Sequence, residues 1–193
     1  SLFDLRDKTV LSHNARDVTE VELVRNKTAL RLMKKDGSWS VAGKIATKGD
    51  SKEIDDLLNS ARASRVDAFI EENPSDLTAF GLNPPSIQLT IQSGEKNTTQ
   101  SLLIGGKNEG GRYYAKTERA NNVFALEPGI VAILSQGELS FIDKTLLEFK
   151  EEDITELSLS NNSEDVRLRA NDQKIWEIDQ PIKSKADAST VNS

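Results

Sequence analysis

Short runs of alternating apolar and polar residues are the clearest pattern in this chain. In residues 17–25, Val21 and Leu23 alternate with glutamates, and residues 28–35 and 39–41 continue in the same way. A period of two predicts strands that are buried on one face only. An Asp-Gly pair separates the last two runs and is typical of a tight turn. These runs therefore predict a three-stranded antiparallel meander.

A change of period marks the first helix. Asp50 has the character of an N-cap, and Ile54, Leu57, Leu58 and Ala61 follow at the spacing i, i+3, i+4, i+7. This spacing places the apolar side chains on one side of a helix, which we expect to run to about residue 65.

The segment ENPSDLTAFGLNPP, residues 72–85, predicts a short helix. Asn73 is expected to cap it, with Pro74 in its first position. Gly81 is expected to end it in a left-handed conformation, with Leu82 folding back onto the last turn.

The second half of the first 140 residues repeats the alternation of strands and a helix. Four strands are predicted, at residues 86–92, 99–106, 111–118 and 122–127. A helix is predicted to follow them at about residues 128–135. The expected fold class is α+β, with two antiparallel β-meanders each followed by a helix. The two meander-helix segments are residues 17–65 and 86–135.

A long internal repeat suggests how these elements are organised. Residues 7–32 match residues 143–168 at an offset of 136. The identical residues of the first copy are Asp7, Lys8, Thr9, Leu11, Asp17, Thr19, Glu20, Leu23, Asn26, Arg31 and Leu32. After one inserted residue, Trp39 matches Trp176. A period this long indicates a domain duplicated in tandem rather than a solenoid.

The repeat divides the chain into a complete unit, residues 1–140, and a truncated second copy, residues 141–193. Asp187 and Val191 occupy the places of Asp50 and Ile54, so the second copy stops where its helix would begin. The sequence starts with Ser1 rather than Met, and we expect the parent protein to extend in both directions.

Composition and charge exclude several functional classes. The 193 residues carry a formal net charge of −6, which disfavours nucleic acids as partners. The chain has no cysteine and one histidine, so disulfides, thiolate metal sites and histidine-rich metal sites are excluded. No stretch approaches the roughly 18 apolar residues of a membrane span. No cofactor site and no metal site is predicted.

Candidate catalytic groups are few. His13 corresponds to Phe149 in the second copy, which favours a packing role over a catalytic one. The acidic pairs Asp55-Asp56 and Glu71-Glu72, and the run at residues 151–153, consist of neighbours that point apart and are expected to be solvated. None of the established hydrolase or nucleotide-binding motifs is present. No catalytic residue is therefore predicted.

The glycine-rich stretch at residues 105–112 lacks the order of a phosphate-binding loop and precedes a strand, so a flexible hairpin tip is expected. The hairpin concentrates cations and aromatic residues in an otherwise acidic chain. Alternation places its two tyrosines on opposite faces, and the outward one is available to a partner or a sugar. The candidate contact residues are Lys107, Arg112, Tyr113, Tyr114 and Lys116.

Several motifs in this order resemble a bacterial family of unknown function, domain family 4340. They are FDLRDKTVL, AFGLNPP, LLIGGKNEGGRYYAK, VFALEP and IDKTLLEF. The resemblance implies an exported protein with an N-terminal membrane anchor and repeated copies of this unit. It also implies, for some members, an auxiliary role beside gliding-motility-type ABC transporters. It supplies no catalytic residues.

The function expected from these observations is a non-catalytic, extracytoplasmic repeat module. It would bind or scaffold protein partners in a bacterial envelope complex, beside an ABC-type transporter, and its parent would be anchored in the membrane. Two alternatives stay open: a domain that binds carbohydrates or small anions, and a hydrolase that uses carboxylates.

Overall fold

The computed structural model describes residues 5–42, 46–94, 98–145, 153–160, 165–171, 173 and 175–187. The chain divides into two compact units, Ser1–Lys144 and Thr145–Ser193, and each is described here by itself. Antiparallel strands dominate the described residues, and two α-helices accompany them in the first unit. The predicted α+β class is confirmed at this level.

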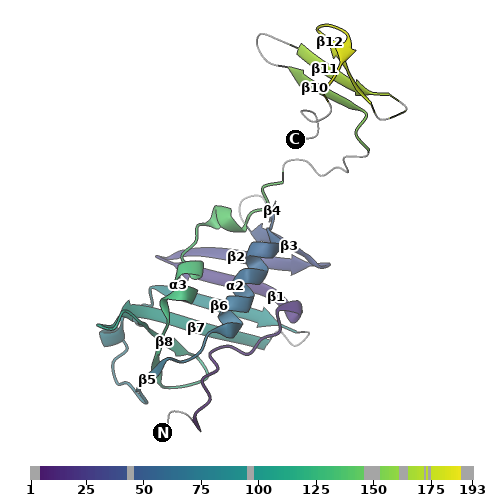
Figure 1. The fold of residues 1–193 in the computed structure, drawn as a ribbon. Helices are drawn as coiled ribbons and strands as arrows, with labels where there is room; N and C mark the ends of the chain where they lie inside the picture. Colours follow the sequence, from purple (N-terminus) through teal and green to yellow (C-terminus); the bar gives the residue numbers. More distant parts are fainter. Residues whose placement is uncertain are drawn as a thin grey trace. The chain divides into compact units, whose positions relative to one another are not determined.

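The first unit is built on one nine-stranded antiparallel sheet with the strand order β4-β3-β2-β1-β6-β7-β8-β9-β5 (Figure 1). The strands are β1 (Val18–Arg25), β2 (Thr28–Lys35), β3 (Ser38–Ala42), β4 (Thr47–Lys48), β5 (Ala68–Glu71), β6 (Ile87–Ser93), β7 (Thr98–Lys107), β8 (Tyr113–Thr117) and β9 (Val123–Leu126). The helices are α2 (Ser51–Ala63) and α3 (Pro128–Leu134), with 3-10 turns η1 (Ala15–Asp17), η2 (Thr78–Phe80) and η3 (Glu138–Phe141).

The two predicted meanders are joined into this single sheet. β1 pairs with β6, and Leu23 lies opposite Leu89 in that ladder. Alternation along each strand predicted the strands and their buried faces, but it carries no information about which strands far apart in the chain become neighbours. The prediction of two meanders therefore did not include the pairing of β1 with β6 that joins them.

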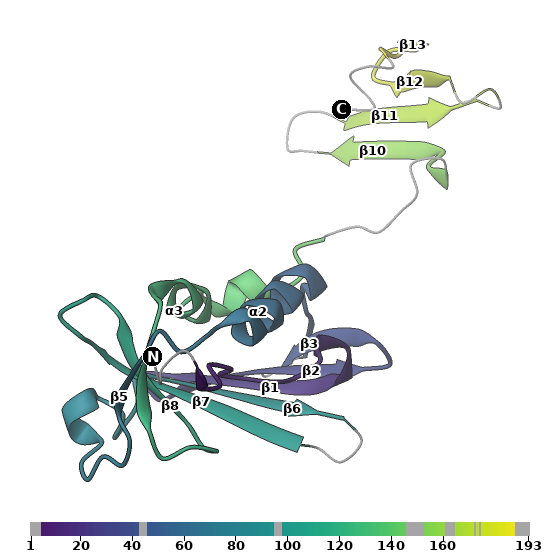
Figure 2. The same ribbon diagram turned by 60° about the horizontal axis from the view of Figure 1, so that its bottom comes forward.

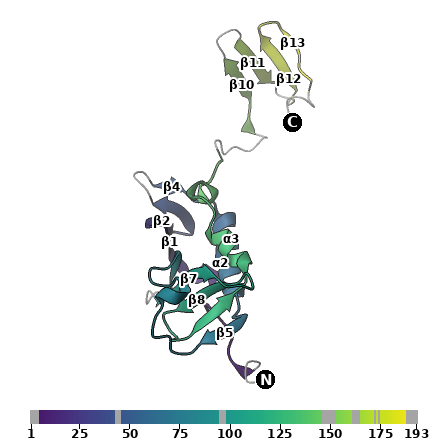
Figure 3. The ribbon, with the colours of Figure 1, turned by 90° about the vertical axis from the view of Figure 1, so that its left-hand side faces the viewer.

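Both helices cover the same face of the sheet (Figures 2 and 3). Asp50 caps α2 as predicted, because its side chain accepts hydrogen bonds from the backbone N–H groups of Lys52 and Glu53. The predicted apolar residues of α2 are all buried: Ile54, Leu57, Leu58 and Ala61. The sheet residues beneath the helices are also buried, among them Leu23, Leu32, Leu89, Ile91, Leu102 and Ile104.

The segment that contains η2 packs on the opposite face of the sheet (Figure 2). Gly81 adopts φ +66°, and the Leu82 N–H donates to the Leu77 carbonyl over 3.0 Å, so the predicted left-handed end is confirmed. The prediction that Asn73 caps a helix is wrong. The Asp76 carboxylate accepts from the Thr78 N–H over 2.8 Å, and the turn begins only there.

The glycine-rich stretch at residues 105–112 is divided between a strand and a tip, and its first part confirms the strand predicted at residues 99–106. Gly105 and Gly106 belong to β7, and a Cβ on Gly105 would overlap the carbonyl oxygen of Phe80. The backbone of the η2 segment passes close to β7 here, which requires a residue without a side chain. The tip itself lies further on, where the Gly111 N–H donates to the Asn108 carbonyl over 3.0 Å.

The second unit contains a four-stranded antiparallel sheet with the order β10-β11-β12-β13. Its strands are β10 (Glu156–Ser160), β11 (Asp165–Ala170), β12 (Trp176–Gln180) and β13 (Ser184–Lys185). Leu168 is buried, whereas Leu157 and Leu159 are 40% and 59% exposed. The expected start of a second helix, at Val191, lies outside the described residues.

Candidate functional site

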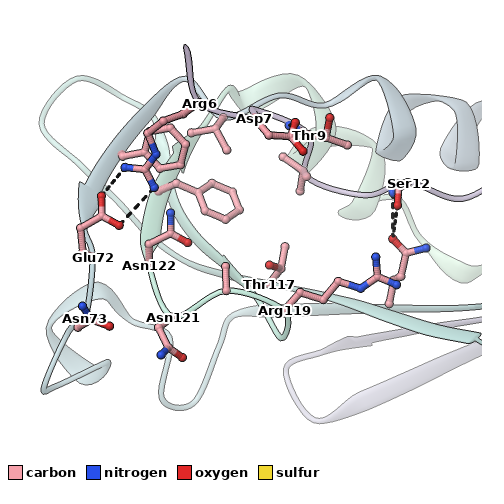
Figure 4. A pocket seen from close by; sticks show the side chains of 16 residues that line it. Arg6, Asp7, Thr9, Ser12, Glu72, Asn73, Thr117, Arg119, Asn121 and Asn122 are labelled. Carbon is pink, nitrogen blue, oxygen red and sulfur yellow. Dashed lines mark hydrogen bonds and ion pairs between the residues drawn. The ribbon is translucent and has the colours of Figure 1, made fainter. Parts of the chain in front are cut away.

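A pocket of about 520 Å³ opens on the helix-covered face of the sheet (Figure 4). Residues from β7, β8 and β9 line it, and the N-terminal segment before η1 forms one of its walls. Thr117 lies opposite the buried Leu102 in the β7–β8 ladder, so its side chain is on the helix side of the sheet. Gln100 precedes Leu102 by two residues and therefore lies on the same face.

Hydrogen bonds fix the N-terminal wall to the rest of the unit. The Val66 N–H donates to the Lys8 carbonyl over 2.9 Å, and the Ser12 N–H donates to Gln100 Oε1 over 2.9 Å. Arg6 pairs with Glu72 at the far end of this wall. These bonds connect the segment to residues on either side of β5 and to β7, so the wall is part of the folded unit.

Three polar side chains in the pocket are more than nine-tenths buried. Gln100, Thr117 and Asn122 are 6%, 9% and 8% exposed. The Asn122 amide points into the pocket (Figure 4), and among the described residues nothing hydrogen-bonds to it. Asn122 is not among the residues with a buried unpaired side-chain atom, so its amide opens to the pocket, where water or a ligand can hydrogen-bond to it.

The pocket contains two arginines in different situations. The Arg6 guanidinium lies 3.4 Å from the centre of the Phe69 ring and is paired with Glu72. Arg119 is exposed, extends along the pocket towards Ser12 (Figure 4), and has no carboxylate partner in the described part of the chain. Arg119 is thus the cation here that is available to a ligand.

The two carboxylates of the pocket are already engaged. Asp7 Oδ1 accepts from the Thr9 N–H over 2.8 Å, and hydrogen bonds from Thr9 lower the pKa of Asp7. Glu72 accepts from Arg6. A general acid in a glycoside hydrolase needs the opposite effect on its pKa, namely a raised value. Asp7 therefore stays ionised near neutral pH.

The residues of the predicted hairpin contact do not form one surface. Arg112 Nε and Nη2 lie 2.7 Å from Asp67 Oδ2 and from Glu127 Oε1 respectively, so neighbours within the unit hold its charge. Lys107 Nζ lies 5.1 Å from the centre of the Tyr113 ring.

The two tyrosines of the hairpin lie on opposite faces, as alternation predicts. Tyr113 pairs with Leu126 and packs against the core. Tyr114 meets Phe80 of the η2 segment edge to face, with ring centres 5.1 Å apart. Lys116 donates to the Ala120 carbonyl, and burial lowers the pKa of Lys116. The hairpin side chains thus mainly stabilise their own unit.

His13 has a structural environment. Its ring is buried, and Nε2–H donates to the Leu58 carbonyl over 3.0 Å, while Nδ1 has no hydrogen-bond partner among the described residues. Burial lowers the pKa of His13, and the charge of Arg62 lowers it further, against the opposing effect of the Leu58 bond. The neutral ring is therefore favoured in the folded chain.

This lowered pKa predicts a pH dependence of stability. Below about pH 6.5 the unfolded chain binds a proton at His13 that the folded chain resists, so the free energy of unfolding should fall as pH decreases. We expect the unfolding free energy of the native protein to fall, relative to that of His13→Phe, between pH 7.5 and 5. Urea titrations across this range measure it, and a pH-independent difference would contradict the assignment.

Sequence reasoning missed the pocket. One usable signal was Gln100, which interrupts the inward-facing series that continues with Leu102 and Ile104. A second was the amide pair Asn121-Asn122 directly before the fully buried strand β9. Polar residues at inward positions indicate a buried network or a site.

Comparison with known proteins places this chain in a family. A family model described as a domain of unknown function (DUF4340) matches residues 39–193, and the chain belongs to that family. The match begins within β3 and includes parts of both units. No curated protein and no solved structure matches the chain significantly.

Two further observations concern the described residues alone. No group of three or more His, Cys, Asp or Glu side chains is placed to hold a metal ion. In the same ranges, neither helix has the length and apolar character that crossing a membrane requires.

Proposed function

We propose that this chain is a non-catalytic binding and scaffolding module of an extracytoplasmic envelope complex, acting beside an ABC-type transporter. In this proposal, residues 1–140 are one complete copy of a duplicated unit and residues 141–193 begin the next. The observation that supports the duplication is the agreement between the two sheets in strand pairing. Protease accessibility in spheroplasts tests the location, and full protection of the native protein would contradict it.

The strand registers of the two units correspond at matched positions, apart from a shift in the β11–β12 ladder between Arg167 and Leu168. Val21 pairs with Leu32 in the first unit, and Leu157 pairs with Leu168 in the second, each shifted by the same 136 positions. Leu32 also pairs with Val41, and the next pair in the second unit is Leu168 with Ile178. The inserted residue lies between β11 and β12, where a longer turn is tolerated.

The corresponding faces differ in exposure. Val21 and Leu23 are 0% exposed on the face that α2 covers, whereas Leu157 and Leu159 are 40% and 59% exposed. Trp176 and Ile178 extend this apolar face and are half-buried. In the first unit the corresponding apolar face is covered by α2, and in the proposed duplication the counterpart of α2 would follow β13 in the same chain.

The first unit indicates the chemistry of the helix that would cover this face. There the same face is covered by α2, whose buried residues recur at i, i+3, i+4 and i+7. We therefore expect the face of β10–β12 to bind an amphipathic helix of this type, in the manner of a helix laid into an apolar groove. The engaged carboxylates Asp7 and Glu72 also favour a binding role over acid–base catalysis.

A peptide with the sequence of residues 50–65 tests this proposal. It contains no tryptophan, and in a Trp39→Phe variant Trp176 is the single tryptophan of the protein. Trp39 Nε1 is buried without a partner, so phenylalanine removes no hydrogen bond to a described residue. We expect a saturable blue shift of Trp176 emission, which reports its transfer from water to an apolar surface.

Two controls make the outcome decisive. A peptide with Leu57→Glu and Leu58→Glu should give no shift, and Leu159→Lys in the protein should abolish the shift with the original peptide. Absence of any shift up to millimolar peptide would contradict the proposal. A dimer of the protein that Leu159→Lys dissociates would also contradict it, because a second copy would then be the occupant.

A further inference from the structure

We propose that the pocket beside β7, β8 and β9 binds an acidic sugar, a hydroxyl-rich ring that carries one carboxylate. This site lies in the first unit and is independent of the helix-binding face proposed for the second.

The amide of Asn122 opens to the pocket, although the residue as a whole is only 8% exposed. Its side chain is more than nine-tenths buried, points into the pocket, and lacks a hydrogen bond to any described residue (Figure 4). A carboxamide presents one acceptor and two donors. A sugar hydroxyl both donates and accepts, so it satisfies such a group where an aliphatic ligand would leave it unpaired.

Neighbouring residues offer the same chemistry. Thr117 presents a hydroxyl on the helix face of β8, and it too has no side-chain hydrogen bond to a described residue. Gln100 is 6% exposed and is oriented by the Ser12 N–H, which donates to its Oε1. Asn121 also lines the pocket, but its amide points away from Asn122 and Thr117 (Figure 4). These neutral side chains both donate and accept hydrogen bonds, which matches the hydroxyl groups of a sugar better than a ligand made of charged groups alone.

Arg119 is the residue that would bind the carboxylate of the proposed sugar. It is the pocket's cation without a carboxylate partner in the described part of the chain, whereas Arg6 is held by Glu72. A guanidinium matches the two oxygens of a carboxylate in a bidentate arrangement. Asp7 and Glu72 line the same pocket and oppose a second negative charge. One carboxylate is therefore favoured over a phosphate, which carries more charge.

The size of the pocket agrees with this ligand. A volume of about 520 Å³ lies within the range of small-molecule sites, and it accommodates a sugar ring with room for solvent or a second ring. The wall formed by the N-terminal segment is hydrogen-bonded in place, so the site is formed before a ligand arrives. Preformed sites lose less conformational entropy on binding.

Isothermal titration of the full chain with glucuronate, galacturonate, glucose and galactose tests the proposal. We expect at least one uronate to bind about tenfold more tightly than its neutral counterpart. Arg119→Gln should remove this preference and leave the neutral sugar unaffected. Asn122→Ala should weaken both, because the lost amide contacts a hydroxyl. Arg16→Gln, an exposed arginine in η1, is the control with the same change of charge.

Folding of the variants is checked by Trp39 fluorescence. Asn122→Asp supplies a second test at nearly constant size, since an added negative charge should repel the uronate more than the neutral sugar. Equal binding of uronate and neutral sugar by the native protein would overturn the proposal. Unchanged uronate binding in both Arg119→Gln and Asn122→Ala would also overturn it, as would no binding of any sugar at 10 mM. The Trp176 peptide experiment is independent of all three outcomes.

Discussion

Replacing Gly105 with alanine is expected to destabilise the first unit by about 3 kcal/mol, at the upper end of the range for overpacking in a close-packed interior. The new Cβ would overlap the Phe80 carbonyl oxygen, and it would also come 3.0 Å from the Gly81 carbonyl oxygen. Neither atom belongs to a flexible side chain, so the whole η2 segment must move. Urea unfolding followed by Trp39 fluorescence measures the loss.

The adjacent residue provides the matched control. A Cβ on Gly106 would lie 3.8 Å from the same Phe80 oxygen, which is an ordinary van der Waals distance. Gly106→Ala should therefore change the free energy of unfolding by no more than about 0.5 kcal/mol, the usual size of a surface substitution. Equal losses at the two positions would mean that the close approach of the η2 segment to β7 does not persist in solution.

The periodic elements of the fold were predictable because their signals are local. The spacing of Ile54, Leu57, Leu58 and Ala61 predicted α2, and Asp50 predicted its start, since a cap acts within one helical turn. The strands followed from alternation in the same way. The joining of β1 to β6 was not predictable, because pairing between strands of similar pattern depends on the packing of the whole sheet.

The candidate site was less accessible to sequence reasoning. The cluster of cations in the hairpin predicted Arg112 as a contact residue. Asp67 and Glu127, which lie elsewhere in the chain, form ion pairs with it. Arg119 lies seven positions further on, in a less conspicuous stretch, and keeps an available charge. Whether a cation is free is a property of the three-dimensional neighbourhood. Composition along the chain could not separate these two arginines.

Corresponding leucines in the two units, Leu23 and Leu159, differ in burial and should differ in their contribution to stability. Leu23→Ala is expected to destabilise the first unit by about 3 kcal/mol, because a fully buried leucine leaves a cavity under α2. Leu159→Ala at the matched position is expected to change the stability of the second unit by less than about 1 kcal/mol, since its side chain is 59% exposed. Trp39 reports on the first unit and Trp176 on the second.

The same pair tests whether a helix occupies the exposed face. With the residue 50–65 peptide bound, Leu159 becomes buried, so Leu159→Ala should weaken peptide binding by about tenfold or more. Leu23→Ala lies beneath α2 and should leave peptide binding unchanged as long as the second unit is folded. A large loss of stability from Leu159→Ala without peptide would show that this face is already covered in solution. The repeat would then stand, but the face would not be available to a partner.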